Sequence, residues 1–213
     1  MAICLAFGSM GAHPPDPRKP GWVAGIVLAA GGASRFGGAK QLAPLRGQPL
    51  LEHSLATLAA ARVHRRIVVL GAEAVRIREE VDLHGAEPVV CADWAQGQAR
   101  SLAAGIAAAG DAGAAMIILG DQPLVSPAAI ERVIAARDGE ALAVRATYEG
   151  KPGHPVLLER ELFGEALALE GDAGARALFS GRGDAVLEVP CEDLGSAVDV
   201  DTIDALRELE GGS

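Results

Sequence analysis

The sequence predicts an α/β protein in which helices cover both faces of a doubly wound, mostly parallel sheet. Strand and helix signals alternate along the chain, with short connections between them. Each candidate strand is a nearly continuous apolar run, as expected when both faces of a parallel sheet are covered. Half of the 213 residues are hydrophobic and only 3% are aromatic. This composition, rich in alanine, valine and leucine, suits three layers of the α/β/α type.

The elements of the first two-thirds of the chain follow this alternation in order. Strands are predicted over residues 23–28, 66–70, 88–91, 115–119 and 142–147. Helices are predicted over residues 50–61, 74–81 and 98–109, and from the capping pair Ser126 and Pro127 to about residue 137. The first of these helices follows Pro49 and has apolar residues at helical spacing.

The pattern changes after Tyr148. A loop is predicted over residues 150–153, and a short strand over residues 156–158 follows it. Two short helical pieces come next. A strand over residues 185–189 and a helix over residues 202–210 complete the chain.

Bulk properties set limits on the class of protein. The net charge of −9 argues against non-specific nucleic-acid binding. Cys4, Cys91 and Cys191 are odd in number and far apart, which argues against a disulfide framework or a zinc site and favours a reducing, cytoplasmic location. No apolar stretch approaches membrane-spanning length, and a secretory signal is not expected. Residues 1–21 are predicted to be a disordered leader, and residues 22–210 a single domain.

A glycine-rich loop carrying two cations follows the first predicted strand. Glycines let backbone N–H groups close around phosphate oxygens, and Arg35 and Lys40 would neutralise the charge gathered there. The loop is not a Walker loop, because Gly38 stands where that motif has its lysine. The dinucleotide pattern G-x-G-x-x-G is also absent. The loop therefore predicts a triphosphate site, with an ordinary glycine-rich turn as the alternative.

Acidic residues follow the fourth predicted strand and precede the last predicted helix. Asp121 lies between Gly120 and a proline turn, and Asp199 and Asp201 lie just ahead of the helix. Magnesium takes few protein carboxylates and otherwise binds waters and substrate phosphates. Asp121 with one member of the second pair would suffice to hold it. The alternatives are a plain turn aspartate and simple helix caps.

Two further loops are candidates for the same site. Trp94 and Gly97 precede a helix bearing Ser101, and they could meet a base or ribose or could serve only in packing and turning. Lys151 and His154 lie on a tight loop rich in glycine and proline. A cation and an imidazole together favour an anionic substrate, although a lone histidine is often structural.

Together these residues resemble the MobA/MocA-like nucleotidyltransferases, and most closely the molybdenum cofactor cytidylyltransferases. The resemblance covers nearly all of residues 22–210, and the order and joint presence of the motifs carry it. The matching residues are Leu28–Gly31 with Arg35, Gly37 and Lys40; Trp94, Gly97, Ser101 and Leu102; Gly120, Asp121, Gln122 and Pro123; Gly153, His154, Pro155 and Val156; residues 171–176; and residues 199–202.

The resemblance implies a Rossmann-like nucleotidyltransferase fold and a Mg²⁺-dependent reaction. CTP and molybdopterin, with or without molybdenum, would give the cytosine dinucleotide cofactor and pyrophosphate. Ala30 favours CTP, because the guanylyl branch usually carries glycine at this place. The chain departs from the family pattern at Cys91, Ala99, Arg100 and Ile203.

The resemblance and the residues together assign roles. Leu28, Ala29, Ala30, Gly31, Gly32, Arg35, Lys40, Gly97 and Ser101 would bind the nucleotide. Arg35, Lys40 and Asp121 would be catalytic, and Asp121 and Asp201 would hold the metal. Lys151, His154, Asp172 and Arg176 would bind the acceptor.

Other functions remain open on the sequence. Guanylyl transfer to molybdopterin and cytidylyl transfer to another phosphorylated acceptor, such as a sugar or isoprenoid phosphate, are the nearest alternatives. A non-catalytic chaperone that delivers cofactor to a client molybdenum enzyme belongs to another class, and the two acidic motifs favour an enzyme over it. An NAD-dependent oxidoreductase is disfavoured by the missing glycine fingerprint.

Overall fold

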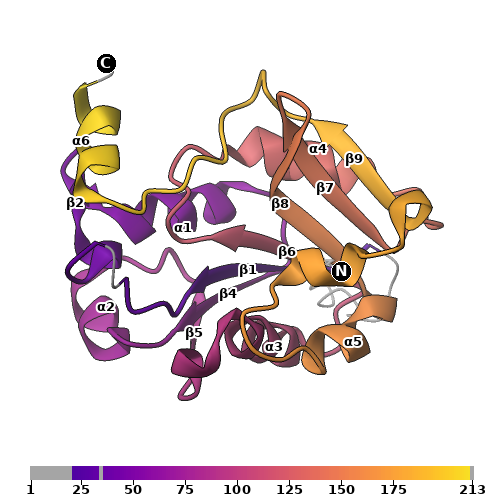
Figure 1. Ribbon diagram of the computed structural model, residues 1–213, viewed down its shortest axis with the longest axis horizontal. Helices are drawn as coiled ribbons and strands as arrows, with labels where there is room; N and C mark the ends of the chain where they lie inside the picture. Colours follow the sequence, from indigo (N-terminus) through magenta and orange to yellow (C-terminus); the bar gives the residue numbers. More distant parts are fainter. Residues whose placement is uncertain (1–20, 34–35, 212–213) are drawn as a thin grey trace, which may run out of the picture.

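The computed structural model describes residues 21–33 and 36–211. The strands within these ranges are β1 (Val23–Ala29), β2 (Pro44–Leu45), β3 (Gln48–Pro49), β4 (Arg65–Leu70), β5 (Glu87–Val90), β6 (Ala114–Leu119), β7 (Ala143–Tyr148), β8 (Lys151–Glu159) and β9 (Val186–Pro190). Among the described residues, one sheet has the strand order β5-β4-β1-β6-β8-β7-β9, and β2 and β3 form a separate hairpin (Figure 1).

The sheet is mostly parallel, as the sequence predicts. β1 pairs in parallel with β4 on one side and β6 on the other, so that Ile26 is level with Ile67 and Ile117. β5 runs parallel to β4, and β9 runs parallel to β7. β8 is antiparallel to both of its neighbours, β6 and β7. The carboxyl ends of β1, β4 and β6 therefore meet at one edge, where ligands bind in sheets of this kind.

Helices cover both faces of the sheet. The α-helices are α1 (Leu50–Ala60), α2 (Ala74–Glu80), α3 (Gln98–Ala109), α4 (Pro127–Ala135), α5 (Phe163–Leu167) and α6 (Ile203–Gly211). Short 3₁₀ helices are η1 (Lys40–Leu42), η2 (Trp94–Gln96), η3 (Arg160–Leu162), η4 (Ala175–Phe179) and η5 (Gly183–Ala185). The predicted cap of α4 is present, because the Ser126 hydroxyl accepts a hydrogen bond from the Ala129 N–H at 3.2 Å.

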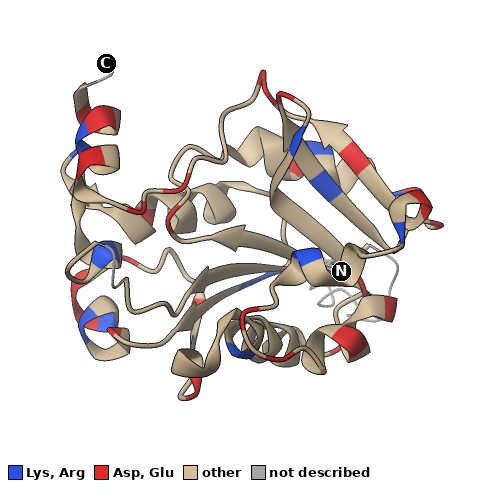
Figure 2. Cartoon of the chain, in the orientation of Figure 1, with Lys and Arg blue, Asp and Glu red and all other residues tan. Residues whose placement is uncertain are grey.

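Two hydrophobic cores lie on opposite faces of the sheet. Val27 of β1 belongs to the core that α1, α2 and α4 cover, whereas Ile26 belongs to the core that α3 and α5 cover. In Figure 2 the positions of charged residues lie mainly on the outer helices and turns, and β1 and β6 contain no charged residue. Burying a valine or isoleucine side chain contributes about 1.5–3 kcal/mol, and β1 does this on both faces. The continuous apolar runs follow from this doubly covered sheet.

The chain after Tyr148 differs from the sequence-based expectation. Apart from Gly150, which lies in the preceding turn, the predicted loop over residues 150–153 and the predicted strand over residues 156–158 belong to one nine-residue strand, β8. Pro152 and Gly153 indicated a loop, but this part of β8 pairs only with β7, because the pairing with β6 covers residues 156–159. A strand free on one side tolerates proline, which cannot donate to a second ladder.

The C-terminal segment returns to the carboxyl edge of the sheet. Val200 is buried with Leu45, Leu50 and Leu206 in a small third core beside α6. The Val200 N–H also donates a hydrogen bond of 2.9 Å to the carbonyl of Asp121. These contacts bring the late acidic motif to the turn that follows β6. None of the described helices is long and apolar enough to cross a membrane.

Candidate active site

A cleft formed by the described residues lies at the carboxyl edge of the sheet and has two adjoining hollows. We call them the large hollow, of about 710 Å³, and the small hollow, of about 330 Å³. The small hollow lies between β1, η1 and the acidic residues, and the large hollow extends past α3 to β8 and η4. Both volumes are typical of small-molecule sites. The residues that line both are Leu28, Gly31, Gln98, Leu119, Asp121 and Asp199.

The glycine-rich loop forms one wall of the small hollow, where β1 ends. Gly31, Ala33 and Lys40 line this hollow. At Gly32 a Cβ atom would lie 2.8 Å from the Trp94 ring, so only glycine lets the chain pass this closely. Arg35, which the sequence predicts to bind phosphate, lies outside the described residues.

Lys40 contacts the predicted metal ligands directly. Its Nζ lies 2.7 Å from Asp121 Oδ2 and 3.1 Å from Asp201 Oδ1. The side chain of Lys40 is only 12% exposed. Burial lowers the pKa of the ammonium, but the charges and hydrogen bonds of the two carboxylates outweigh burial and raise the pKa above its usual value. The lysine predicted to bind phosphate and the two aspartates predicted to hold the metal therefore form ion pairs with one another.

Hydrogen bonds fix the acidic residues. The buried Gln122 side chain donates from Nε2 to Asp199 Oδ1 at 2.8 Å and to the carbonyl of Ala197 at 3.2 Å. Burial raises the pKa of Asp199, as do the negative charges of Asp121 and Asp201, although the hydrogen bond from Gln122 opposes this rise. Asp199 is thus engaged by an amide, whereas Asp201 is directed to the ammonium of Lys40.

The donor set suits a divalent metal with few protein ligands. Asp121 and Asp201 already share one cation, the ammonium of Lys40. Within the described part of the chain, no three acidic, histidine or cysteine side chains cluster as a complete metal cage. Magnesium needs no such cage, because it keeps waters and binds substrate phosphates. The pair therefore fits a metal that arrives with an anionic substrate.

The loop before α3 and the loop before η4 pack against each other. Gly97 has φ +119°, a backbone conformation that side chains rarely adopt, and a Cβ there would overlap the carbonyl of Gly171. The Ala99 N–H donates a hydrogen bond of 3.1 Å to the same carbonyl. Ser101 on α3 and Asp172 after this contact both line the large hollow. The predicted nucleotide-binding motif around Gly97 therefore contacts the predicted acceptor motif at the carbonyl of Gly171.

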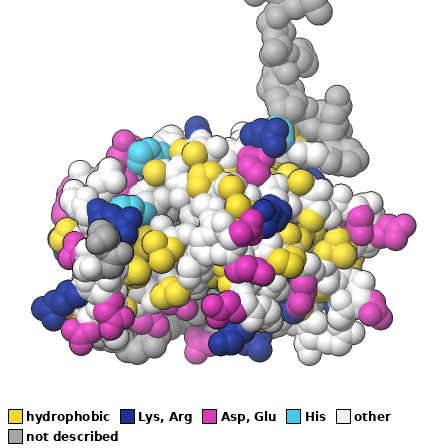
Figure 3. Space-filling model, turned by 90° about the horizontal axis from the view of Figure 1, so that it is seen from above, with side chains coloured by type: hydrophobic (Ala, Val, Ile, Leu, Met, Phe, Trp, Pro, Cys, Tyr) yellow, Lys and Arg dark blue, Asp and Glu magenta, His cyan; other side chains and the backbone are white. Residues whose placement is uncertain are grey.

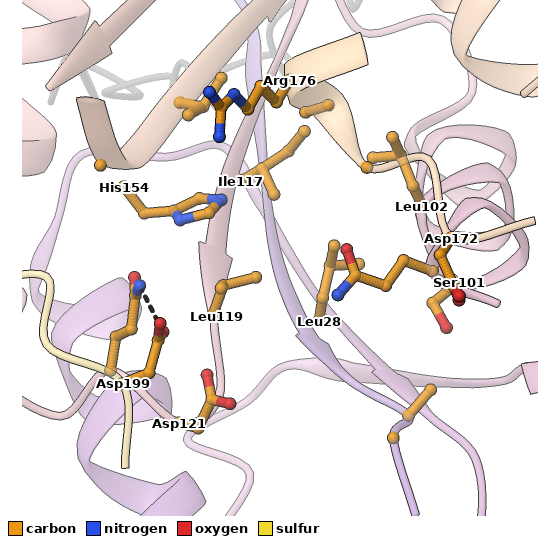
Figure 4. A pocket seen from close by; sticks show the side chains of 18 of the residues that line it. Leu28, Ser101, Leu102, Ile117, Leu119, Asp121, His154, Asp172, Arg176 and Asp199 are labelled. Atoms are coloured by element: carbon orange, nitrogen blue, oxygen red, sulfur yellow. Dashed lines mark hydrogen bonds between the residues drawn. The ribbon is translucent and has the colours of Figure 1, made fainter. Parts of the chain in front are cut away.

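Three of the four predicted acceptor residues line the large hollow. Figure 4 shows His154 and Arg176 on one side, Asp172 near α3 on the other, and Asp121 at the end nearest the small hollow. Burial of the imidazole lowers the pKa of His154 to about 4, although the charge of Asp121 opposes this shift. The histidine is therefore neutral at pH 7. Lys151 is exposed on the β7–β8 hairpin, and it is not in the cavity wall formed by the described residues.

Arg145, Phe179 and Gln98 line the cavity wall and were not predicted as site residues. Arg145 on β7 lies with its guanidinium 5.5 Å from the centre of the Phe179 ring, and it pairs with Glu188 on β9. Gln98, at the start of α3, lines both hollows. A lone arginine within an apolar strand was the available signal for Arg145. Nothing in the sequence distinguishes Phe179 or Gln98 from ordinary packing residues.

The outer surface differs from the cleft. On the face shown in Figure 3, acidic and basic side chains are interspersed and hydrophobic side chains lie between them. The whole chain carries a net charge of −9. A phosphate ligand must therefore be caught by local cations in the cleft rather than by a general positive field.

Comparison with known proteins settles the family. Residues 25–186 match the MobA-like NTP transferase domain. The chain belongs to this family. The resemblance predicted from the motifs is confirmed at this level, and the protein is a nucleotidyltransferase of the MobA-like type.

Two relatives each align with most of this MobA-like protein. Nicotine blue oxidoreductase of Paenarthrobacter nicotinovorans is 32% identical over 195 residues, which cover 88% of this chain and 96% of the relative. Rv0371c of Mycobacterium tuberculosis is 34% identical, with a TM-score of 0.80 over 89% of this chain and 97% of that one.

Two further structures bear on the metal and the fold. A structure of Rv0371c complexed with manganese has a TM-score of 0.78 at 31% identity, over 90% of this chain and 100% of that one. A nucleotidyl transferase of Methanothermobacter has a TM-score of 0.75 at 24% identity, over 90% and 97% of the two chains. It shares the Rossmann-like fold of this MobA-like protein, as the sequence predicts.

Proposed function

We propose that this protein transfers CMP from CTP to the terminal phosphate of molybdopterin and releases pyrophosphate, with Mg²⁺ as cofactor. The observation that carries the proposal is the meeting of Lys40, Asp121 and Asp201 at the small hollow, beside the glycine-rich loop. One cation and two carboxylates at a hollow of about 330 Å³ suit a metal-bound triphosphate. The adjoining large hollow leaves room for a second substrate. We expect the enzyme to act in the cytoplasm.

The reaction needs positioning and charge stabilisation rather than a general base. An oxygen of the acceptor phosphate, already ionised, attacks the α-phosphorus of CTP in line, and the bond from that phosphorus to the departing pyrophosphate breaks. Lys40, Arg35 and the amides of the loop would stabilise the negative charge on the leaving group. Mg²⁺ bound by Asp121 and Asp201 would supply further positive charge at the phosphates.

The remaining groups would orient the two substrates. Trp94, Gly97 and Ser101 would flank the nucleoside. Ala30 lines the same hollow, and it favours CTP over GTP because the cytidylyl branch carries alanine where the guanylyl branch usually carries glycine. His154, neutral at pH 7, would hydrogen-bond the acceptor, and Arg176 would bind its anionic part. Asp172, in the wall of the large hollow, and Lys151, on the exposed hairpin outside that wall, complete the proposed acceptor set.

Product analysis tests this proposal. The full chain is incubated with Mg²⁺, either CTP or GTP, and one acceptor at a time: molybdopterin, a sugar phosphate or an isoprenoid phosphate. The product masses are measured by mass spectrometry, and pyrophosphate is assayed. We expect the cytosine dinucleotide and pyrophosphate from CTP. A product from GTP alone would favour the guanylyl alternative, and a product only with sugar or isoprenoid phosphates would change the acceptor. Absence of nucleotidyl transfer to all of these acceptors would contradict the proposal.

One observation favours a second candidate of another class. Nicotine blue oxidoreductase shares 32% identity with this chain. The chain nevertheless lacks the glycine fingerprint of dinucleotide binders. A titration distinguishes the two classes: NAD binding tighter than CTP with Mg²⁺ would favour an oxidoreductase. If CTP binds but no transfer occurs, a chaperone that serves a client molybdenum enzyme becomes the better account.

A further inference from the structure

The ammonium of Lys40 lies at the carboxylates where the proposed mechanism places a divalent metal ion. The ammonium of Lys40 is within 3.1 Å of a carboxylate oxygen of both Asp121 and Asp201. These are the two residues proposed to hold the metal. The ammonium and a divalent ion cannot both lie between the same oxygens, because their like charges repel at such distances. A divalent ion that binds between these two oxygens must therefore displace the ammonium of Lys40.

The ion pairs of Lys40 with Asp121 and Asp201 are partly buried, which disfavours replacement of the ammonium by a metal ion from solution. The side chains of Lys40, Asp121 and Asp201 are 12%, 26% and 35% exposed. Partly buried charge pairs are less screened by water and salt than pairs on an open surface. A metal ion approaching the free enzyme must displace the ammonium into the cleft, where the neighbouring carboxylate of Asp199 already accepts a hydrogen bond from Gln122. A triphosphate provides a new anion to receive the ammonium.

The main chain at Lys40 is fixed, so the exchange is a motion of the side chain. The buried Gln41 donates from Nε2 to the carbonyls of Ala29 and Gly31, at 3.0 and 2.8 Å. The Lys40 N–H donates to the carbonyl of Gly38 at 2.8 Å. These bonds anchor the residue between the end of β1 and the glycine-rich loop. The flexible four-carbon stem then lets the ammonium turn from the carboxylates to phosphates held at that loop.

We propose that Lys40 is a built-in counter-ion that keeps a divalent metal off Asp121 and Asp201 until a nucleoside triphosphate draws the ammonium away. Metal then binds with the nucleotide and not before it. The inference rests on the proposed function only in assuming that a triphosphate occupies the small hollow. It adds a role for Lys40 in the order of binding, besides its contact with the leaving group.

The first test measures Mn²⁺ binding to the full chain without nucleotide, from the electron paramagnetic resonance signal of the free ion. Lys40→Met removes the charge and keeps the length of the side chain, and we expect it to bind Mn²⁺ at least about tenfold more tightly than the wild type. Lys40→Arg should behave as the wild type does. Arg207→Met, which removes an exposed positive charge on α6 outside both hollows, is the matched control for binding.

Further variants locate the effect and separate the two proposals. Adding Asp201→Asn to Lys40→Met should abolish the gain in Mn²⁺ affinity. Equal or weaker Mn²⁺ binding by Lys40→Met than by the wild type would overturn the inference, even if the wild type transfers nucleotide. Tighter Mn²⁺ binding that depends on Asp201 would support it even if the products expected under the proposed function do not form.

The second test uses the wild type and does not depend on the folding of a variant. The chain has three lysines, Lys19, Lys40 and Lys151, so ¹³C-labelled lysine side chains give a simple NMR spectrum. We expect the Lys40 signal to shift on addition of metal-free CTP and to stay in place when Mg²⁺ is added alone at the same concentration. A shift with Mg²⁺ alone equal to that with CTP would contradict the proposal.

Discussion

Asp121 connects the fold to the chemistry at the scale of a single residue. It follows β6, which is buried along most of its length, and its carbonyl holds Val200 by a hydrogen bond of 2.9 Å. Its carboxylate faces Lys40 at 2.7 Å in the wall of both hollows. The backbone of this residue thus fixes the C-terminal acidic motif, while its side chain provides charge in the cleft.

Replacing Asp121 with asparagine should remove most of the activity without unfolding the protein. The amide keeps the size of the side chain but loses the charge that would hold the metal. We expect kcat to fall by more than about a hundredfold, as for loss of a main electrostatic element. The control is Asp111→Asn, at a surface aspartate whose side chain is 68% exposed. If Asp121→Asn kept a near-normal kcat in a steady-state assay, the role assigned to Asp121 would be wrong.

His154 should make the stability of the protein depend on pH. Its pKa in the folded state is about 4, below the ordinary value of 6.5, so the unfolded chain binds more protons between these values. The free energy of unfolding should therefore fall as pH decreases from about 6.5 to about 4, by at most about 1.4 kcal/mol per pH unit from this group. His154→Gln should lose this component. Parallel stability profiles of the two proteins in urea titrations would contradict the assignment.

At the scale of elements, the cleft depends on the contact between the start of α3 and the loop before η4. Gly97 ends η2 with φ +119°, and its neighbour across the contact is the carbonyl of Gly171. A bond of 3.1 Å from the Ala99 N–H uses that same carbonyl. Because Ser101 and Asp172 lie on the two sides of this contact, it sets the width of the large hollow.

Gly97→Ala should break this contact. The added Cβ overlaps the Gly171 carbonyl, and alanine is strained at this φ, so we expect a loss of at least about 2 kcal/mol in the free energy of unfolding. Gly164→Ala in α5 is the matched control, because a Cβ there meets no atom within 4 Å and alanine is a good helix former. Equal stability of the two variants in thermal unfolding would show that the contact does not hold the loops together.

Helices and strands whose ends are marked by residues in the local sequence could be predicted accurately. α3 begins at Gln98 and ends at Ala109, as predicted, because Gly97 and Gly110 flank it and both have positive φ. β8 was predicted too short because Pro152 and Gly153 are typical of loops. Proline is excluded from a strand that has a neighbour on each side, but this part of β8 has only one. Its pairing on one side only is a property of the sheet, and no local pattern reveals it.

At the scale of the whole molecule, the sequence predicted which residues lie at the cleft, but it did not predict the contacts that they make with one another. Lys40 and Asp121 are 81 positions apart, and Lys40 and Asp201 are 161 positions apart. The rule that ligands bind beyond the carboxyl ends of parallel strands predicts their common edge. It does not predict an ion pair, which depends on side-chain reach and on the third core around Val200. Arg145 and Phe179 were missed for the same reason.

The central claim is that a metal-bound nucleoside triphosphate fills the small hollow between the glycine-rich loop and the acidic residues. Crystals grown with CTP and Mn²⁺ test it most directly, because the anomalous scattering of manganese locates the ion independently of the rest of the map. We predict a manganese peak bound by Asp121 and Asp201, the triphosphate along residues 31–40, and the ammonium of Lys40 on the phosphates. Manganese away from both aspartates, with the nucleotide outside the small hollow, would contradict the account.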